Sequence, residues 1–181
     1  VHGCVGSVLS GWYRIDWLRA WIETVSAEDQ TALFEIVTRD NIEAVVAKLN
    51  LPEHLLHRVS VYSKKGDEMP ETIRRHDLSL LFYSGGELSE VARAPTRMAE
   101  VLATGLPVVA SSGVGDVDSI ISDHQVGIVL EDGNPNQMRA AIEKLNRLLS
   151  DPQLSHRCRD TAEELFSLER GVGGYLATYK T

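Results

Sequence analysis

The sequence has few cysteines, no long apolar run and too few basic residues to cover a whole face with positive charge. Its two cysteines, Cys4 and Cys158, lie at opposite ends of the chain and outside any CxxC or histidine spacing. Neither a zinc site nor a disulfide framework is therefore indicated, and a reducing, cytoplasmic setting is the simplest expectation. No segment approaches the roughly 20 apolar residues that a membrane-spanning helix needs.

The charge balance and the histidines argue against two further classes of partner. Lysine and arginine number 18 against 26 aspartates and glutamates, which gives a formal net charge of -8. A nucleic-acid binder needs clustered cations over a face, so no nucleic-acid partner is expected. The six histidines show no metal spacing such as HExxH. No DxD motif is evident on a loop after a hydrophobic strand, because Asp116, Val117 and Asp118 are predicted at the start of a helix. We expect neither a metal ion nor another cofactor.

The composition that remains is that of an ordinary globular protein. Hydrophobic residues make up 43% and charged residues 24% of the 181 residues. A chain of this length buries about two-thirds of its unfolded surface, so one domain over residues 1–181 is expected. The first residues are typical of a strand, with no signal peptide, and the chain opens on Val1. These features predict a fragment cut at a domain edge.

Short apolar runs alternate with segments of helical spacing along most of the chain. The runs predict buried strands at residues 3–9, 31–37, 58–62, 78–83, 106–111 and 127–130. Such alternation requires right-handed crossovers, which place helices on both faces of a parallel sheet. The sequence therefore predicts an α/β fold, a Rossmann-like doubly wound sheet of about six strands. Extra helices are predicted at residues 135–149, 151–166 and 168–180.

The longest predicted loop, SGGELSEVARAP at residues 84–95, follows the fourth strand. In an open parallel sheet the ligand crevice lies beyond the carboxyl ends of the strands, where this loop is expected. Gly85 and Gly86 would let the backbone approach a ligand closely. A helix is predicted to begin at Thr96, and its free N–H groups are a favourable site for a diphosphate.

Two charged residues in the first turns of that helix allow two interpretations each. Arg97 adds positive charge for a phosphate, or it is a solvated surface residue. Glu100 would repel phosphates unless it serves another group, and a ribose diol can donate both hydroxyl hydrogens to one carboxylate. Alternatively, Glu100 complements the helix dipole.

One stretch of sequence resembles a known family. APTRMAEVLATGLPVVASSGVGDVDSIISDHQVGIVLED, at residues 94–132, is similar to the segment SPTKxxExLAxGxPVVA, a glycine-rich turn and a GxLV strand of GT-B glycosyltransferases of the glycosyl transferases group 1 kind. VGSVLSGWYRID, RHDLSLLFYS and LFSLERGVGGYLATYK fit the same template. The resemblance implies the carboxyl-terminal, donor-binding domain of a two-domain enzyme, with the amino-terminal acceptor domain absent.

The resemblance also assigns roles to individual residues. The family's glutamate at the position of Glu100 contacts the ribose hydroxyls of the donor. After the first strand, Ser7 replaces the family's diphosphate-binding arginine, and Arg14 stands close to the family's lysine. The wall that contacts the base follows the third strand, which places Ser63, Lys64 and Lys65 there. A lysine pair in a loop is also typical of a solvated surface.

The first glutamate of the family's Glu-x7-Glu pattern, which contacts the transferred sugar, is missing. Ala92 stands eight residues before Glu100, where that first glutamate is expected. Glu87 and Glu90 lie in the same loop, and Glu90 is the candidate that would take over the catalytic sugar contact. Altered sugar contacts are expected.

The resemblance implies a retaining, metal-independent hexosyltransferase whose partner is a UDP- or GDP-linked sugar. The fragment alone is expected to bind this donor and to transfer nothing. Any peripheral membrane association would belong to the full-length enzyme. Two alternatives remain open at this point: a nucleotide-sugar 2-epimerase of the same architecture, and a non-catalytic doubly wound interaction domain.

Overall fold

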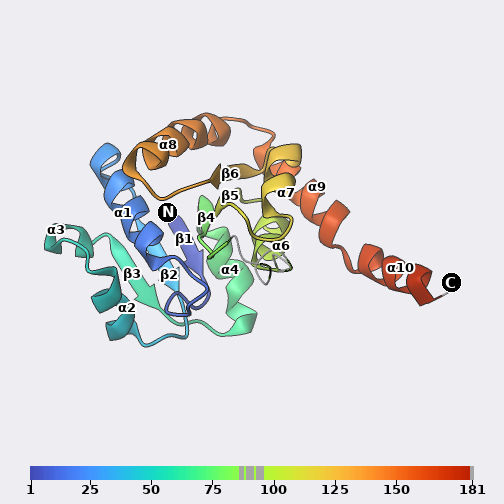
Figure 1. Cartoon of the computed structure of the whole chain (residues 1–181), viewed down its shortest axis with the longest axis horizontal. Helices are drawn as coiled ribbons and strands as arrows, with labels where there is room; N and C mark the ends of the chain where they lie inside the picture. Colours follow the sequence, from blue (N-terminus) through green and yellow to red (C-terminus); the bar gives the residue numbers. More distant parts are fainter. Residues whose placement is uncertain (86–87, 89–91, 93–95, 180–181) are drawn as a thin grey trace.

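The six predicted strands form one parallel sheet (Figure 1). The structure, a computed structural model, describes residues 1–85, 88, 92 and 96–179. Its strands are β1 (His2–Val5), β2 (Phe34–Val37), β3 (Val59–Tyr62), β4 (Leu78–Leu81), β5 (Val108–Ser111) and β6 (Gly127–Leu130). Their spatial order is β3-β2-β1-β4-β5-β6, with every pair parallel. The prediction of a doubly wound Rossmann-like sheet is confirmed, and its order reverses between β1 and β4.

Helices cover both faces of this sheet. Those that the structure describes are α1 (Ile15–Glu28), α2 (Ile42–Leu49), α3 (Glu53–Leu56), α4 (Met69–Arg74), α6 (Thr96–Ala103), α7 (Val117–His124), α8 (Pro135–Leu149), α9 (Leu154–Phe166) and α10 (Leu168–Tyr179), with a 3₁₀ helix at Gly66–Glu68. Residues of α1, α2 and α8 form the core on one face. Residues of α4, α6, α7 and α9 form the core on the other.

The first strand is shorter than the apolar run that predicted it. The run at residues 3–9 forms a strand only to Val5, because Gly6 adopts φ +130° and turns the chain away from the sheet. The backbone N–H of Gly6 still bonds the carbonyl of Val37, at 3.0 Å. Val8 enters the core from the turn instead of from the strand. The turn after β1 is thereby held at the carboxyl edge of the sheet.

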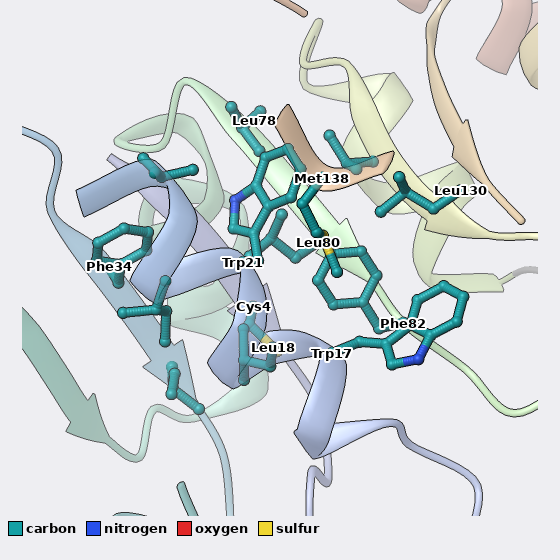
Figure 2. Close-up of a cluster of buried hydrophobic side chains, with 14 of the residues drawn as sticks. Cys4, Trp17, Leu18, Trp21, Phe34, Leu78, Leu80, Phe82, Leu130 and Met138 are labelled. Carbon is teal, nitrogen blue, oxygen red and sulfur yellow. The ribbon is translucent and has the colours of Figure 1, made fainter. Parts of the chain in front are cut away.

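Aromatic side chains of α1 fill the core between this helix, the sheet and α8 (Figure 2). Trp17 and Trp21 each meet the ring of Phe82 edge-on, with ring centroids 6.1 Å apart. Trp21 is fully buried, whereas Trp12 in the preceding turn is 50% exposed. Packing of the first helix is thus the role of two of the three tryptophans, Trp17 and Trp21.

The three helices predicted after the last strand are confirmed as α8, α9 and α10. Figure 1 shows that α9 leads away from the sheet and that α10 extends beyond it. The side chains of Leu168, Val172, Tyr175, Leu176 and Tyr179 on α10 are exposed. In the part of the chain that the structure describes, no helix is long and apolar enough to cross a membrane.

Candidate functional site

A cavity of about 740 Å³ opens at the carboxyl ends of β1 and β2 and extends between α4 and α6. Its floor is apolar, because Val5 and Val37 end their strands there and Ile73 of α4 packs beside them. Polar and charged side chains surround this floor: Ser7, Thr38, Arg39, Lys64, Arg74, Arg97, Glu100 and Thr104. The cavity thus combines an apolar base with a polar, largely basic wall, on the side of the sheet where ligands bind doubly wound folds.

The predicted pair on α6 lies on this wall. Arg97 and Glu100 are one helical turn apart, and the guanidinium of Arg97 donates a hydrogen bond to the carboxylate of Glu100. The side chain of Glu100 is 54% exposed and that of Arg97 28% exposed, so both remain accessible from the cavity. Thr96 is exposed at the first position of α6, where the prediction placed the start of the helix. The structure therefore brings Arg97 and Glu100 together at one end of the cavity.

A second ion pair lies across the cavity, after β3. The ammonium of Lys64 is 2.8 Å from the carboxylate of Glu68. The same carboxylate accepts the backbone N–H of Lys65, at 3.0 Å. Ser63, which was predicted to line this wall, is exposed directly after β3 but does not line the cavity. Lys64, which was predicted on the same wall, does line the cavity, and Lys65 does not.

Arg14 lies outside the cavity lining, in contacts with its own chain neighbours. Its guanidinium makes two bonds to the carboxylate of Asp16, at 3.1 and 2.9 Å. It also lies over the ring of Trp17, 4.7 Å from the centroid. The bonds from Arg14 are the main reason that the pKa of Asp16 is lowered. A ligand phosphate would have to compete with Asp16 for this arginine, so the predicted diphosphate contact of Arg14 stays a prediction.

Gly85 has a structural reason to be glycine. A Cβ atom there would lie 2.5 Å from the backbone oxygen of Ser112 and 2.9 Å from that of Gly113. The loops after β4 and β5 therefore approach each other more closely than any other residue allows. The close approach of Gly85 to a ligand stays a prediction. Gly86 and Glu90 lie outside the described residues.

Below the apolar floor lies a polar cluster whose histidine is buried and whose Glu35 and Tyr62 side chains are partly exposed. The imidazole of His76 is buried over Gly3 and lies 3.2 Å from the Glu35 carboxylate, which also accepts the Tyr62 hydroxyl. Burial lowers the pKa of His76 and outweighs the opposing effect of Glu35. Burial, reinforced by the bond to Glu35, raises the pKa of Tyr62 to about 12. This cluster is a neutral imidazole and a phenol holding one carboxylate, and it does not line the cavity.

Several residues that line the cavity were not predicted from the sequence. Arg39 follows β2 as Ser7 follows β1, and the rule that ligands lie at the carboxyl ends of parallel strands would have found it. Arg74 is the last residue of α4 and Thr104 directly follows α6. Both reach the cavity because these helices pack on the same face. No sequence pattern marks such positions. In the described ranges, no three histidine, cysteine or acidic side chains gather to hold a metal ion.

Comparison with protein families identifies the class. The family described as glycosyl transferases group 1 matches residues 1–148, most of the chain. The chain belongs to this family, and its sheet and helices are those of a GT-B glycosyltransferase domain. No curated protein sequence matches the chain.

Solved structures share the fold at low sequence identity. A variant of S. aureus TarM, in complex with fondaparinux, α-GlcNAc-glycerol and UDP, matches 99% of this chain and 35% of its own, with a TM-score of 0.72 and 21% identity. WaaG, a glycosyltransferase involved in lipopolysaccharide biosynthesis, matches 94% of this chain and 45% of its own, with a TM-score of 0.66 and 21% identity.

HepE from Anabaena, in complex with UDP, matches 98% of this chain and 48% of its own, with a TM-score of 0.66 and 15% identity. The chain thus spans between about a third and a half of the length of these structures. Together these structures show the fold. The family match over residues 1–148 is what favours a transferase over the epimerase and over the non-catalytic domain.

Proposed function

We propose that this chain is the donor-binding domain of a retaining, metal-independent glycosyltransferase, and that its cavity takes a nucleoside diphosphate sugar. The observation that carries the proposal is the Arg97 and Glu100 pair on the cavity wall. A cation suits the diphosphate, and an accessible carboxylate suits the ribose diol. The solved structures of TarM and HepE with UDP support a nucleoside diphosphate as the ligand class.

In this proposal the domain supplies position and charge. The sugar is transferred to an acceptor atom as its bond to the diphosphate breaks, and negative charge grows on the oxygen of the departing diphosphate. Arg97, Arg39 and Lys64 are the cations of the cavity wall that stabilise this charge. The N–H groups at the start of α6 add to them. By holding the diphosphate in place, the domain also orients the sugar for transfer, which lowers the barrier of the reaction.

The remaining features of the transferase concern the whole protein. We expect the acceptor site and any general base to lie on another domain, so that the chain alone binds donor without transferring sugar. Retention is tested by the anomeric configuration of the product of the full-length enzyme, and metal independence by its activity in a chelator. The two buried free thiols, Cys4 and Cys158, support a reducing, cytoplasmic setting.

Glu100→Gln is expected to weaken UDP binding about tenfold, the equivalent of one hydrogen bond to a charged group. The amide keeps the size of the side chain but donates where the ribose hydroxyls need an acceptor. Binding of inorganic pyrophosphate should not weaken, because Arg97 loses its internal partner. Isothermal titration calorimetry with UDP, GDP and pyrophosphate measures each effect.

Glu143→Gln is the matched control, since Glu143 is exposed on α8, on the opposite face of the sheet. It should leave every affinity unchanged. Equal UDP affinity of Glu100→Gln and the unmodified chain would remove the ribose role. If neither UDP nor GDP raised the melting temperature at millimolar concentration, the donor-binding proposal itself would be wrong.

A further inference from the structure

The turn after β1 presents three hydrogen-bond donors beside the cavity, and one carboxylate of the protein takes all three. Asp40 accepts the hydroxyl of Ser7 at 2.8 Å, the backbone N–H of Val8 at 2.7 Å and that of Leu9 at 2.9 Å. The hydroxyl of Thr38 accepts the backbone N–H of Asp40 at 3.0 Å. The carboxylate is therefore fixed against the turn from the end of β2.

These donors are the kind that binds phosphate. Two successive backbone N–H groups and a hydroxyl at the carboxyl end of a strand form a concave anion site. Ser7 lines the cavity, and so does Arg39, the residue before Asp40. The donor set therefore borders the space that the proposed donor diphosphate would occupy. Its present occupant is the side chain of Asp40.

The charge on Asp40 is well supported by its surroundings. Burial opposes ionisation, but the bonds from Leu9, Ser7 and Val8 outweigh it and lower the pKa of the carboxyl group. Position 7 carries a serine where the family resemblance implies an arginine. The turn therefore has no cation at this position that could pair with the Asp40 carboxylate in place of the three donors. A bound phosphate beside the turn would meet a negative charge.

The same pattern recurs around the cavity. Arg97 is paired with Glu100, and Lys64 is paired with Glu68. Within the described residues, Arg39 and Arg74 line the cavity without a carboxylate partner. An incoming diphosphate thus competes with the protein's own carboxylates at three of its contact points. Asp40 differs from the other two because its donors in the turn are all neutral and two of them are successive backbone N–H groups, which no rotation of a side chain can redirect.

We propose that Asp40 determines phosphate specificity: its carboxylate is an internal anion that occupies the phosphate-binding donors of the turn after β1 and thereby lowers the preference of the cavity for diphosphate over monophosphate. This inference rests on the proposed donor-binding function. Removing the carboxylate frees three donors and removes one repelling charge. The affinity for the second phosphate then rises, where loss of a purely structural contact would lower it.

The experiment compares UDP with UMP on the unmodified 181-residue chain, Asp40→Ala and Asp40→Asn by titration calorimetry. Asp40→Ala is expected to bind UDP about five to ten times more tightly, with UMP affinity nearly unchanged, since about one hydrogen bond to a charged group is gained. Asp40→Asn keeps an acceptor oxygen for the turn and loses the charge, so a smaller gain is expected.

Asp29→Ala is the matched control. Asp29 likewise accepts a backbone N–H and a hydroxyl, both from Thr31 at 2.7 and 2.6 Å, but it lies before β2 at the other edge of the sheet. It should leave the ratio of UDP to UMP affinity unchanged. A ratio in Asp40→Ala that is equal to or below that of the unmodified chain overturns the proposal.

A second readout separates this inference from the donor-binding proposal. Inorganic pyrophosphate is titrated while the amide resonances of Val8 and Leu9 are followed by NMR. They should move in Asp40→Ala and stay in place in the unmodified chain. That result without any UDP binding supports the role of Asp40 and removes the proposed function. Equal movement in both proteins overturns the role of Asp40, whatever UDP does.

Discussion

Replacing Trp21 by alanine is expected to lower the free energy of unfolding by about 3–5 kcal/mol, the usual cost of removing a large buried aromatic side chain. Trp21 is fully buried between α1 and the sheet, against Phe82 (Figure 2). Its indole N–H also donates to Nδ1 of His2, at 3.0 Å. In a domain of this size such a loss lowers the melting temperature by about 6–20 °C.

Trp12→Ala is the control for this measurement, because the chain offers the same residue type in a half-exposed position nine residues earlier. The expected loss there is about 1 kcal/mol or less. Urea unfolding followed by circular dichroism measures both variants. A similar midpoint shift for the two would contradict the position of Trp21 in the core. Trp21→Phe keeps a ring and removes the donor, so an intermediate loss is expected.

The architecture could be predicted from the sequence, because the spacing of apolar residues and the order of strands and helices determine the architecture. Runs of branched apolar residues separated by helical spacing require a parallel, doubly wound sheet. Five strands lie within the predicted runs, and β1 begins one residue before its run. The start of α6 was also predictable, since Thr96 is a local signal for the start of a helix. Arg97 and Glu100 follow from the same local pattern, which is why they were found together.

Contacts between neighbours in space were not predictable. Asp40 meets Ser7 because β1 and β2 are adjacent, and strand order is a property of the whole fold. Gly85 is needed because the loop after β5 passes beside it, 27 residues further along the chain. For Arg14 the family resemblance suggested a ligand contact. In the structure its guanidinium bonds the carboxylate of Asp16, two residues further along the chain.

Acidification is expected to destabilise the folded chain by about 2 kcal/mol between pH 7 and pH 5 through His2 alone, from the linkage between its pKa and folding. The ring of His2 packs against Trp21 and Phe34, with centroids 6.0 and 5.2 Å away. Burial is the main reason that its pKa falls from 6.5 to about 4. Its Nδ1 accepts the indole N–H of Trp21, which only the unprotonated nitrogen can do.

The sign follows from the direction of that shift. A histidine whose folded pKa lies below its unfolded pKa resists protonation in the folded state, while the unfolded chain takes up the proton. Its contribution is therefore complete above pH 6.5 and is lost as the pH falls towards 4. The lowered pKa of His76 acts in the same direction. Lowering the pH should thus loosen both faces of the sheet, since the two histidines lie on opposite faces of β1.

His2→Gln tests the assignment, because glutamine offers Trp21 an acceptor and does not titrate in this range. Urea unfolding at pH 7 and pH 5 should show a difference that is about 2 kcal/mol smaller in His2→Gln than in the unmodified chain. His156→Gln, in an exposed position on α9, should keep the full difference. If His2→Gln lost as much stability on acidification as the unmodified chain, the acid sensitivity would have to come from His76 and the carboxylates. The buried pair of His2 and Trp21 would then be a packing contact without a role in the pH response.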